Sequence, residues 1–231
     1  MDEASEAPPA PGAARRSRIQ ERNRAVILEA ALAVFSAEGF RGATLERIAR
    51  EARLSKPNLL YYFPSKEAIH SALLGGLLDA WLAPLRDLDP AGEPLDEVLA
   101  YVAKKLDLAR DFPRESRLFA NEILRGAPHL GAALGGGLAL LVAEKAAVLE
   151  AWMEEGRLSR VPATHLIVSV WALTQHYADF ETQVRAVLGQ GHDPFVEAGG
   201  FLETLFRRLL APPSPVPSPA PSPAPVPVPP C

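Results

Sequence analysis

Polar side chains that can bond phosphates and base edges are concentrated in residues 55–62 of this chain. Lys56, Asn58 and Tyr61 carry an ammonium, an amide and a phenol group. An asparagine amide can pair with the edge of a base, whereas lysine and tyrosine side chains bond phosphate oxygens. A hydrophobic core would use Leu59 and, to a lesser degree, Tyr62. We therefore expect this segment to lie against DNA.

Two short helices joined by a tight turn are predicted to position these groups. Thr44, Ser55 and Ser65 each place a side-chain oxygen immediately before a helical stretch, so we predict that all three are N-caps. Pro57 is tolerated in the first turn of the second helix, where backbone amides have no helical partner. A helix, a turn and a second helix within about 20 residues is the layout of a helix-turn-helix.

The distribution of charge agrees with one DNA-facing end. The sequence of 231 residues has a net charge of −4, but residues 15–66 hold eleven Lys/Arg against five Asp/Glu. The remainder holds thirteen basic and twenty-three acidic residues. Arg15, Arg16 and Arg18 begin a basic arm, which we expect to contact phosphates or the minor groove. The alternative for the arm is a solvated helix start.

The composition predicts a soluble, cytoplasmic protein. The one cysteine, Cys231, is the last residue and cannot form an internal disulfide, which suits a reducing compartment. The acidic, proline-rich start of the chain does not have the pattern of a signal peptide. The longest apolar run, residues 130–143, is too short to span a bilayer, so we expect no membrane segment.

An all-α fold of about nine helices is predicted, because 48% of the residues are hydrophobic and strand signals are scarce. We expect a disordered tail at residues 1–14, a DNA-binding domain at 15–66, an effector-binding and dimerisation domain at 67–210, and a disordered proline-rich tail at 211–231. The last helices are predicted at residues 128–155, 163–188 and 195–210, with a kink or loop at the glycines 135–137.

Residues 54–68, LSKPNLLYYFPSKEA, resemble the DNA-binding signature of TetR-family repressors. Three further blocks, DAWLAPL at 79–85, RDFPRESRLF at 110–119 and WALTQHYADF at 171–180, resemble a branch of that family that regulates pyrimidine utilisation. The similarity covers roughly residues 15–210. It implies an all-helical, homodimeric repressor that a ligand releases from DNA, with the eighth and ninth helices (163–188 and 195–210) forming the dimer interface.

The resemblance also implies which side chains contact double-stranded operator DNA. Asn58 would read a base edge and Lys56 a base or a phosphate, while the other residues hold the backbone. Core packing is the alternative for Tyr62. With the arm included, the predicted DNA contacts are Thr44, Ser55, Lys56, Asn58, Tyr61, Tyr62, Lys66, Arg15, Arg16 and Arg18.

The resemblance further implies a small-molecule pocket in each subunit. Trp171 and Gln175 lie four residues apart, so they share a helix face, which Asp179 continues. An indole beside an amide suits a flat heterocycle such as uracil or thymine, because it offers a stacking surface together with a donor and an acceptor. The alternative is core packing or a place in the dimer interface. The predicted effector-binding residues are Trp81, Phe119, Asn121, Glu122, Trp171, Gln175 and Asp179.

Three other functions fit less well. Within the family, the alternative is a repressor that responds to a different, hydrophobic ligand. A metal sensor would need a set such as His176, Asp179 and Glu122, which a polar patch explains more simply; we predict no metal site and no cofactor. An enzyme is not expected, because the chain has no internal cysteine for a Cys–His pair and no recognisable nucleophile motif.

Overall fold

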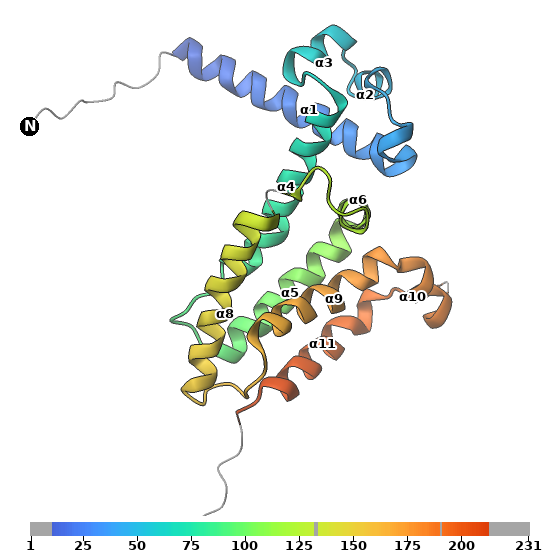
Figure 1. The fold of residues 1–231 in the computed structure, drawn as a ribbon. Helices are drawn as coiled ribbons and strands as arrows, with labels where there is room; N and C mark the ends of the chain where they lie inside the picture. The colour runs from blue at the N-terminus through green and yellow to red at the C-terminus, as the bar shows by residue number, and fades with distance from the viewer. Residues whose placement is uncertain (1–10, 132–133, 190, 213–231) are drawn as a thin grey trace, which may run out of the picture.

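The computed structural model describes residues 11–131, 134–189 and 191–212 (Figure 1). Helices joined by short loops make up this part of the chain, with no strand among the described residues, as the sequence predicted. In chain order the elements are α1 (Pro11–Gly42), α2 (Leu45–Glu51), α3 (Lys56–Tyr62), α4 (Lys66–Arg86), α5 (Pro94–Asp111), α6 (Pro113–Leu124), the π-helical turn η1 (Leu134–Leu138), α8 (Ala139–Glu154), α9 (Ala163–Asp179), α10 (Glu181–Leu188) and α11 (Phe195–Leu210).

Helices α1, α2 and α3 form the small N-terminal unit at the top of Figure 1. The three predicted N-caps are confirmed, because Thr44, Ser55 and Ser65 each accept a hydrogen bond from the backbone N–H three residues later. The turn between α2 and α3 contains Arg53 with φ 56°, in the left-handed region that non-glycine residues rarely adopt. This turn sets the direction in which α3 leaves the body of the unit.

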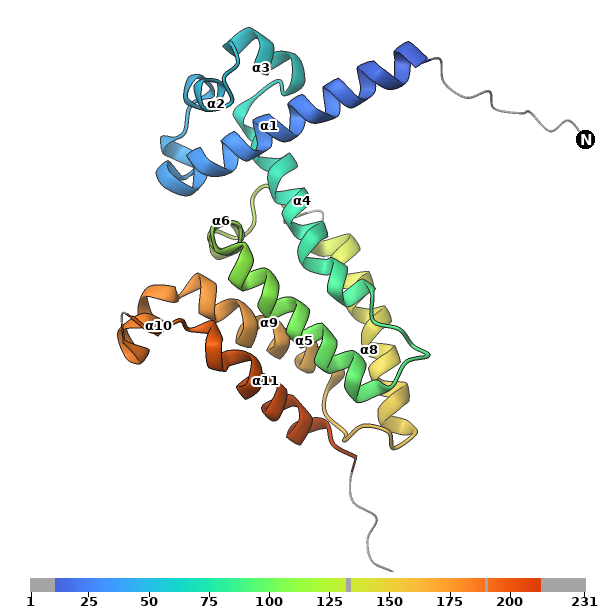
Figure 2. The same ribbon diagram turned by 180° about the vertical axis from the view of Figure 1, so that it is seen from behind.

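Helix α4 joins the N-terminal unit to the rest of the molecule (Figures 1 and 2). Its first half contributes Ile69 and Leu74 to a hydrophobic cluster that also contains buried residues of α1, α2 and α3. Its last turn contributes Leu85 to a second cluster, built with α5, α8, α9 and α11. One continuous helix therefore has side chains in both cores.

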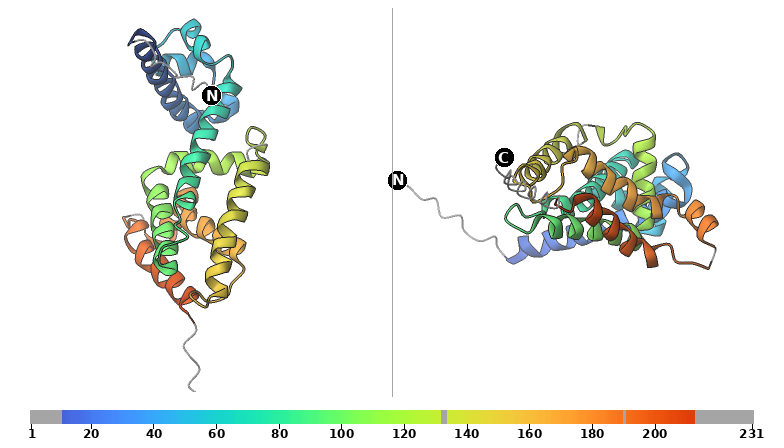
Figure 3. Two further views of the ribbon diagram at one scale, coloured as in Figure 1. Left: turned by 90° about the vertical axis from the view of Figure 1, so that its left-hand side faces the viewer. Right: turned by 90° about the horizontal axis from the view of Figure 1, so that it is seen from below.

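The second cluster forms the core of the larger body, which lies below the N-terminal unit in the left view of Figure 3. Helix α5 packs against α9 on one side and α11 on another, and α8 packs against α9. Helix α6 contacts both α1 and α9, so it lies between the two parts of the molecule. The larger body is thus a stack of antiparallel and crossed helices without a sheet among the described residues.

Several predicted boundaries differ from the structure. Helix α1 begins at Pro11, inside the segment predicted to be disordered, and it kinks at Gly39, where φ is 68°. The predicted helix 163–188 is interrupted at Phe180, whose backbone (φ −114°, ψ 30°) is not helical, so α9 and α10 are separate. No glycine or proline marks that break in the sequence. The irregularity predicted at glycines 135–137 is confirmed as the π-helical turn η1. The predictions for residues 1–10 and 213–231 lie outside the described residues.

One helix among the described residues, α4, has the length and apolar character that a membrane span would need. Half of its most apolar window is buried inside the protein. The apolar character of α4 is explained by its side chains, which contribute to both hydrophobic clusters.

Candidate nucleic-acid interface and effector cavity

Helix α3 presents the predicted DNA-contacting groups on an exposed face. Leu59 is fully buried and anchors the helix, whereas Lys56, Asn58 and Tyr61 are exposed on its other sides. Tyr61 has 71% of its surface exposed. The Lys56 ammonium donates to Glu46 Oε1 of α2 at 2.6 Å, and this bond lowers the pKa of the Glu46 carboxyl. The Tyr61 hydroxyl accepts a hydrogen bond from Gln20 Nε2 of α1 at 3.3 Å, and the exposed Asn58 amide lies on the same helix.

Tyr62 connects α3 to α1. Its hydroxyl accepts a hydrogen bond from Asn23 Nδ2 at 2.6 Å, and its carbonyl accepts one from the Arg24 guanidinium at 3.0 Å. The same guanidinium lies over the Phe63 ring, 4.3 Å from its centre. Tyr62 is thus held by α1 and packs against the first hydrophobic cluster, as the core-packing alternative predicted. A DNA contact by its hydroxyl stays a prediction.

The remaining predicted DNA contacts have different surroundings. Thr44 is exposed and caps α2. The Lys66 ammonium is half-buried and donates to the carbonyls of Phe40 and Ala43, at 2.8 and 2.9 Å, so it closes the C-terminal end of α1. Arg18 is exposed on α1, whereas the side chains of Arg15 and Arg16 lie outside the described residues. The basic arm is thus part of a helix along its described length.

Four of the predicted effector-binding residues meet at one cavity of about 50 Å³. They are Trp81, Phe119, Trp171 and Gln175, contributed by α4, α6 and α9. Leu138 of η1 forms a further part of the wall. The Trp171 indole N–H donates to the Tyr101 hydroxyl at 2.6 Å, which fixes the ring. The Trp81 indole nitrogen is buried and has no hydrogen-bond partner among the described residues. A buried donor without a partner is costly, and a ligand that accepts its hydrogen bond would remove that cost.

Lys105 of α5 also lines this cavity, and sequence reasoning missed it. Its ammonium group is buried, donates to the Trp81 carbonyl at 3.3 Å and lies 5.6 Å from the centre of the Trp81 ring. Burial lowers the pKa of Lys105 to about 7, although the charge of Asp179 opposes the shift. Helical spacing could have predicted its burial, because Lys105 lies on the buried face of α5 together with Val98, Tyr101 and Val102.

Asp179 does not line this cavity. Its carboxylate accepts a hydrogen bond from Ser116 Oγ at 2.6 Å. Burial raises the pKa of Asp179, and the charges of Arg117 and Lys105 oppose that effect. Asp179 is therefore placed to influence Lys105, a different role from the direct effector contact that was predicted.

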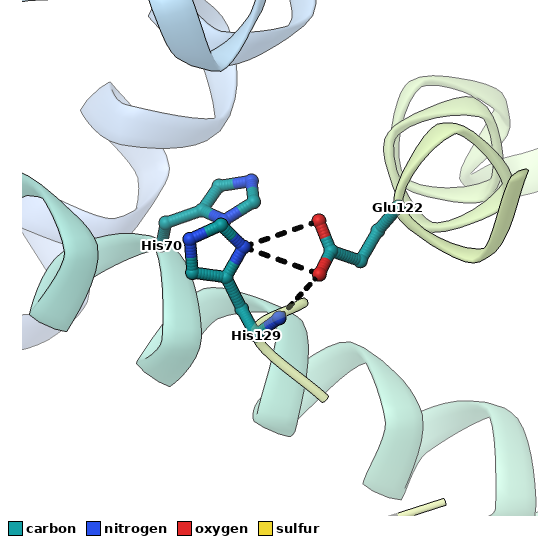
Figure 4. A group of neighbouring side chains, drawn as sticks. All are labelled: His70, Glu122 and His129. Carbon is teal, nitrogen blue, oxygen red and sulfur yellow. Dashed lines mark hydrogen bonds and ion pairs between the residues drawn. The ribbon is translucent and has the colours of Figure 1, made fainter. Parts of the chain in front are cut away.

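Asn121 and Glu122 do not line the cavity that contains Trp171. Both line a separate cavity of about 490 Å³ between the C-terminal end of α1 and α6. Asn121 Nδ2 donates to the Arg117 carbonyl at 2.8 Å, and the Glu122 carboxylate accepts from the His129 backbone N–H at 2.7 Å (Figure 4). The predicted effector set is thus divided between two cavities, because neighbouring residues of α6 point in different directions.

The residues that the metal-sensor alternative would need are not brought together. Glu122 faces His129, Asp179 is bonded to Ser116, and the exposed His176 ring stacks on Phe180 at 4.8 Å. Within the described residues, the group of three or more side chains that could hold an ion is a different one: His70, Glu122 and His129.

Comparison with known families divides the chain in two. Residues 27–73 match the family described as bacterial regulatory proteins of the tetR family. Residues 74–212 match the C-terminal region of YcdC-like proteins, which belongs to the same class of regulators. The two matches meet within α4, the helix that joins the two hydrophobic clusters.

Individual relatives agree with this division. The chain is 49% identical over 175 residues to the HTH-type transcriptional regulator RutR of Escherichia coli K12, which covers 76% of this chain and 82% of that protein. It is 35% identical over 91 residues to the transcriptional repressor NicS of Pseudomonas putida, covering 38% of this chain and 43% of the repressor. Among solved structures, a transcriptional regulator of Streptomyces coelicolor superimposes with a TM-score of 0.65 at 25% identity, covering 83% of this chain and 99% of that one. These relatives are regulators, in agreement with the expectation that the chain is not an enzyme.

The buried ammonium of Lys105 predicts a pH-dependent stability. Between its folded pKa of about 7 and its ordinary value of 10.5, the unfolded chain binds more protons than the folded chain. The free energy of unfolding therefore increases as the pH rises from 7 to 10.5, and this contribution is lost as the pH falls back to the folded pKa of about 7. The increase approaches about 1.4 kcal/mol per pH unit. We expect Lys105→Met to abolish this rise, as measured by thermal unfolding from pH 7 to 9.5. Lys104→Met, at an exposed neighbour, should keep the wild-type profile; equal slopes for all three proteins would refute the assignment.

Proposed function

Because this chain belongs to the TetR family of bacterial transcriptional regulators, we propose that it represses its target genes until a small planar pyrimidine, such as uracil or thymine, releases it from operator DNA. Regulators of this family bind operator DNA and a ligand, and act as dimers. The proposal adds the class of ligand, the residues that hold it and the surfaces that pair.

One observation carries the choice of ligand: two indole rings, an amide and an amine converge on the cavity of Trp81, Trp171, Gln175 and Lys105. Indole faces stack on a flat ring, and the Gln175 amide can both donate to and accept from an imide edge. The Lys105 ammonium and the unpartnered Trp81 N–H are donors suited to the two carbonyl oxygens of uracil. Such a ligand would satisfy polar groups that are buried in its absence.

The present cavity is small. Its volume of about 50 Å³ has room for one or two water molecules, whereas ligand pockets usually measure about 300–1,000 Å³. Leu138 belongs to η1, and a β-carbon added to any of the three glycines of this turn would meet no other side chain within 4 Å. We infer that entry of the ligand displaces η1 and Leu138, since that wall is the least constrained.

Displacement of η1 would reach the DNA-binding unit through α4. Helix α8 follows η1 directly and packs against α4, and the Trp81 ring of α4 is itself part of the cavity wall. A change in the direction of α4 alters the spacing of the two copies of α3 in a dimer. Two recognition helices must fit successive major grooves, about 34 Å apart, so altered spacing weakens operator binding.

For the dimer interface, we propose the outer faces of α9 and α11. Val168 and Leu173 of α9 and Phe201, Leu205 and Leu209 of α11 are large apolar side chains that the single chain leaves exposed. Phe201, Leu205 and Leu209 are spaced four residues apart, so they form one ridge along α11. A second copy of the same face would cover them in a two-fold symmetric interface.

The DNA interface predicts the effect of removing one amide. Asn58→Ala should weaken binding to the operator about tenfold or more at fixed salt, because a base contact is worth about 1–3 kcal/mol. Fluorescence anisotropy on DNA from upstream of the protein's own gene and its neighbours measures this effect. Arg160→Ala, in the loop before α9 at the opposite end of the molecule, should bind as tightly as wild type (Figure 1). Unchanged affinity of the Asn58 variant would rule out its role in reading DNA.

The cavity predicts that one amide controls the response to ligand. Gln175→Leu preserves the approximate volume but removes both polar groups, so we expect uracil affinity to fall at least tenfold while operator binding without ligand is unchanged. Isothermal titration calorimetry with uracil and thymine measures the affinity. Gln183→Leu, on the exposed face of α10, is the matched control. If the wild type releases no detectable heat with either base at millimolar concentration, the pyrimidine proposal fails, and a hydrophobic effector becomes the better candidate.

The dimer proposal predicts a monomer when one charge is placed on the ridge of α11. Phe201→Glu should convert the protein to a monomer without loss of helical content, because the side chain is 58% exposed in the single chain. Sedimentation velocity gives the mass, and circular dichroism reports the fold. Leu140→Glu, at a similarly exposed position of α8, should remain dimeric. A dimeric Phe201→Glu protein would place the interface elsewhere.

A further inference from the structure

Three side chains that can ligate metals meet where α4 leaves the N-terminal unit. His70 belongs to α4, Glu122 to α6 and His129 to the loop after α6, and Figure 4 shows the two imidazoles and the carboxylate turned toward one another. One potential ligand atom from each residue lies within 4.8 Å of the others. The Phe40 ring packs against both imidazoles, with ring centres 4.7 and 4.9 Å apart, so the group is covered by the C-terminal end of α1.

Two members of the group are buried, and for one of them, His70, the hydrogen bonds of the chain do not account for a buried nitrogen. Glu122 is 5% exposed, and His129 Nδ1 lies 3.2 Å from its Oε1 atom. His70 is 2% exposed, yet its Nδ1 atom has no hydrogen-bond partner among the described residues. A buried ring nitrogen without a partner costs stability unless something else occupies the position in front of it.

We propose that His70, Glu122 and His129 bind a divalent transition-metal ion of the zinc type. Two imidazoles and one carboxylate form a donor set that zinc accepts, with a fourth position left for water. Ligand atoms around a tetrahedral zinc lie about 3.3 Å apart, given bonds of about 2.0–2.1 Å. His129 and Glu122 already have that separation, so binding requires His70 to approach them by a small side-chain rotation.

The surroundings supply the fourth position and limit the affinity. His70 and Glu122 line the cavity of about 490 Å³ between α1 and α6, so water can reach the group from that side. Arg125 lines the same cavity, and Lys66 lies one turn before His70 on α4. Both cations act on His70, so they oppose the ion that the Glu122 carboxylate attracts. A reversible site, rather than a permanently loaded one, fits this balance of charges.

The location of the site connects the ion to regulation. An ion held by His70 and Glu122 would fix α4 against α6 one turn after the DNA-binding unit ends. Operator affinity would then depend on the metal as well as on the organic effector, through a coupling between separate sites. This regulatory consequence rests on the function proposed above, whereas the binding of the ion does not.

Cobalt(II) tests the binding directly, because histidine and carboxylate ligands in a tetrahedral site give strong visible absorption bands. The full-length chain, freed of metals with a chelator, is titrated with Co²⁺ and then with Zn²⁺. We expect bands that saturate at one Co²⁺ per chain and disappear when Zn²⁺ displaces it. A wild-type protein that develops no saturable visible bands would overturn the proposal, whatever its behaviour toward DNA or uracil.

Variants assign the bands to these residues. His129→Gln and Glu122→Gln should each weaken Co²⁺ binding more than tenfold; His129 lies in a loop, and a glutamine at 122 can still accept from the His129 backbone N–H. His165→Gln, an exposed histidine of α9, and Cys231→Ser are the controls and should bind like wild type. Circular dichroism confirms that each variant is folded. Bands lost in either control, or retained in both site variants, would refute the assignment.

Discussion

The continuity of α4 is the constraint on which the other features depend. Its first half is buried with the helices of the N-terminal unit, and its last turn is buried with the helices of the larger body. A helix packed at both ends cannot bend freely, since each end is held by tightly packed side chains. Both the aromatic cavity, through Trp81, and the histidine cluster, through His70, have a member on this helix. We therefore expect a structural change at either site to alter the direction of α4.

Local patterns made the DNA-binding unit predictable, whereas long-range packing limited what could be predicted of the sites. Thr44, Ser55 and Ser65 cap helices because of chemistry contained within three residues, so the sequence was sufficient there. The break at Phe180 has no local signal. Glu122 and Trp171 line different cavities because of how α6 is oriented against its neighbours. The spacing of residues within one helix does not show how that helix is oriented against another. The resemblance identified Trp81, Phe119, Trp171 and Gln175 but not Lys105, whose position on the apolar face of α5 becomes meaningful once α4 is packed beside it.

Buried ionisable groups mark both candidate ligand sites. Burial shifts the pKa values of Lys105 and Asp179 in the directions that disfavour charge. Burial also lowers the pKa of His70 to about 4, so its ring is neutral at pH 7. A well-packed leucine or methionine would usually stabilise such positions better. Perturbed groups of this kind cluster at functional sites, and here they lie on either side of the junction between the two units.

The hydrogen-bond pattern of the π-helical turn η1 determines which way the residues of α8, the helix that follows it, face. A π-helix carries one residue more in each turn than an α-helix, so the extra residue can be passed along the helix or expelled. If η1 were to adopt α-helical hydrogen bonds, each later residue would rotate by about 100° around the axis. Leu138 would then turn away from Trp81 and Trp171, and a different side chain would take its place. Such a slip of one residue at the glycines would give the wall of the cavity a second arrangement.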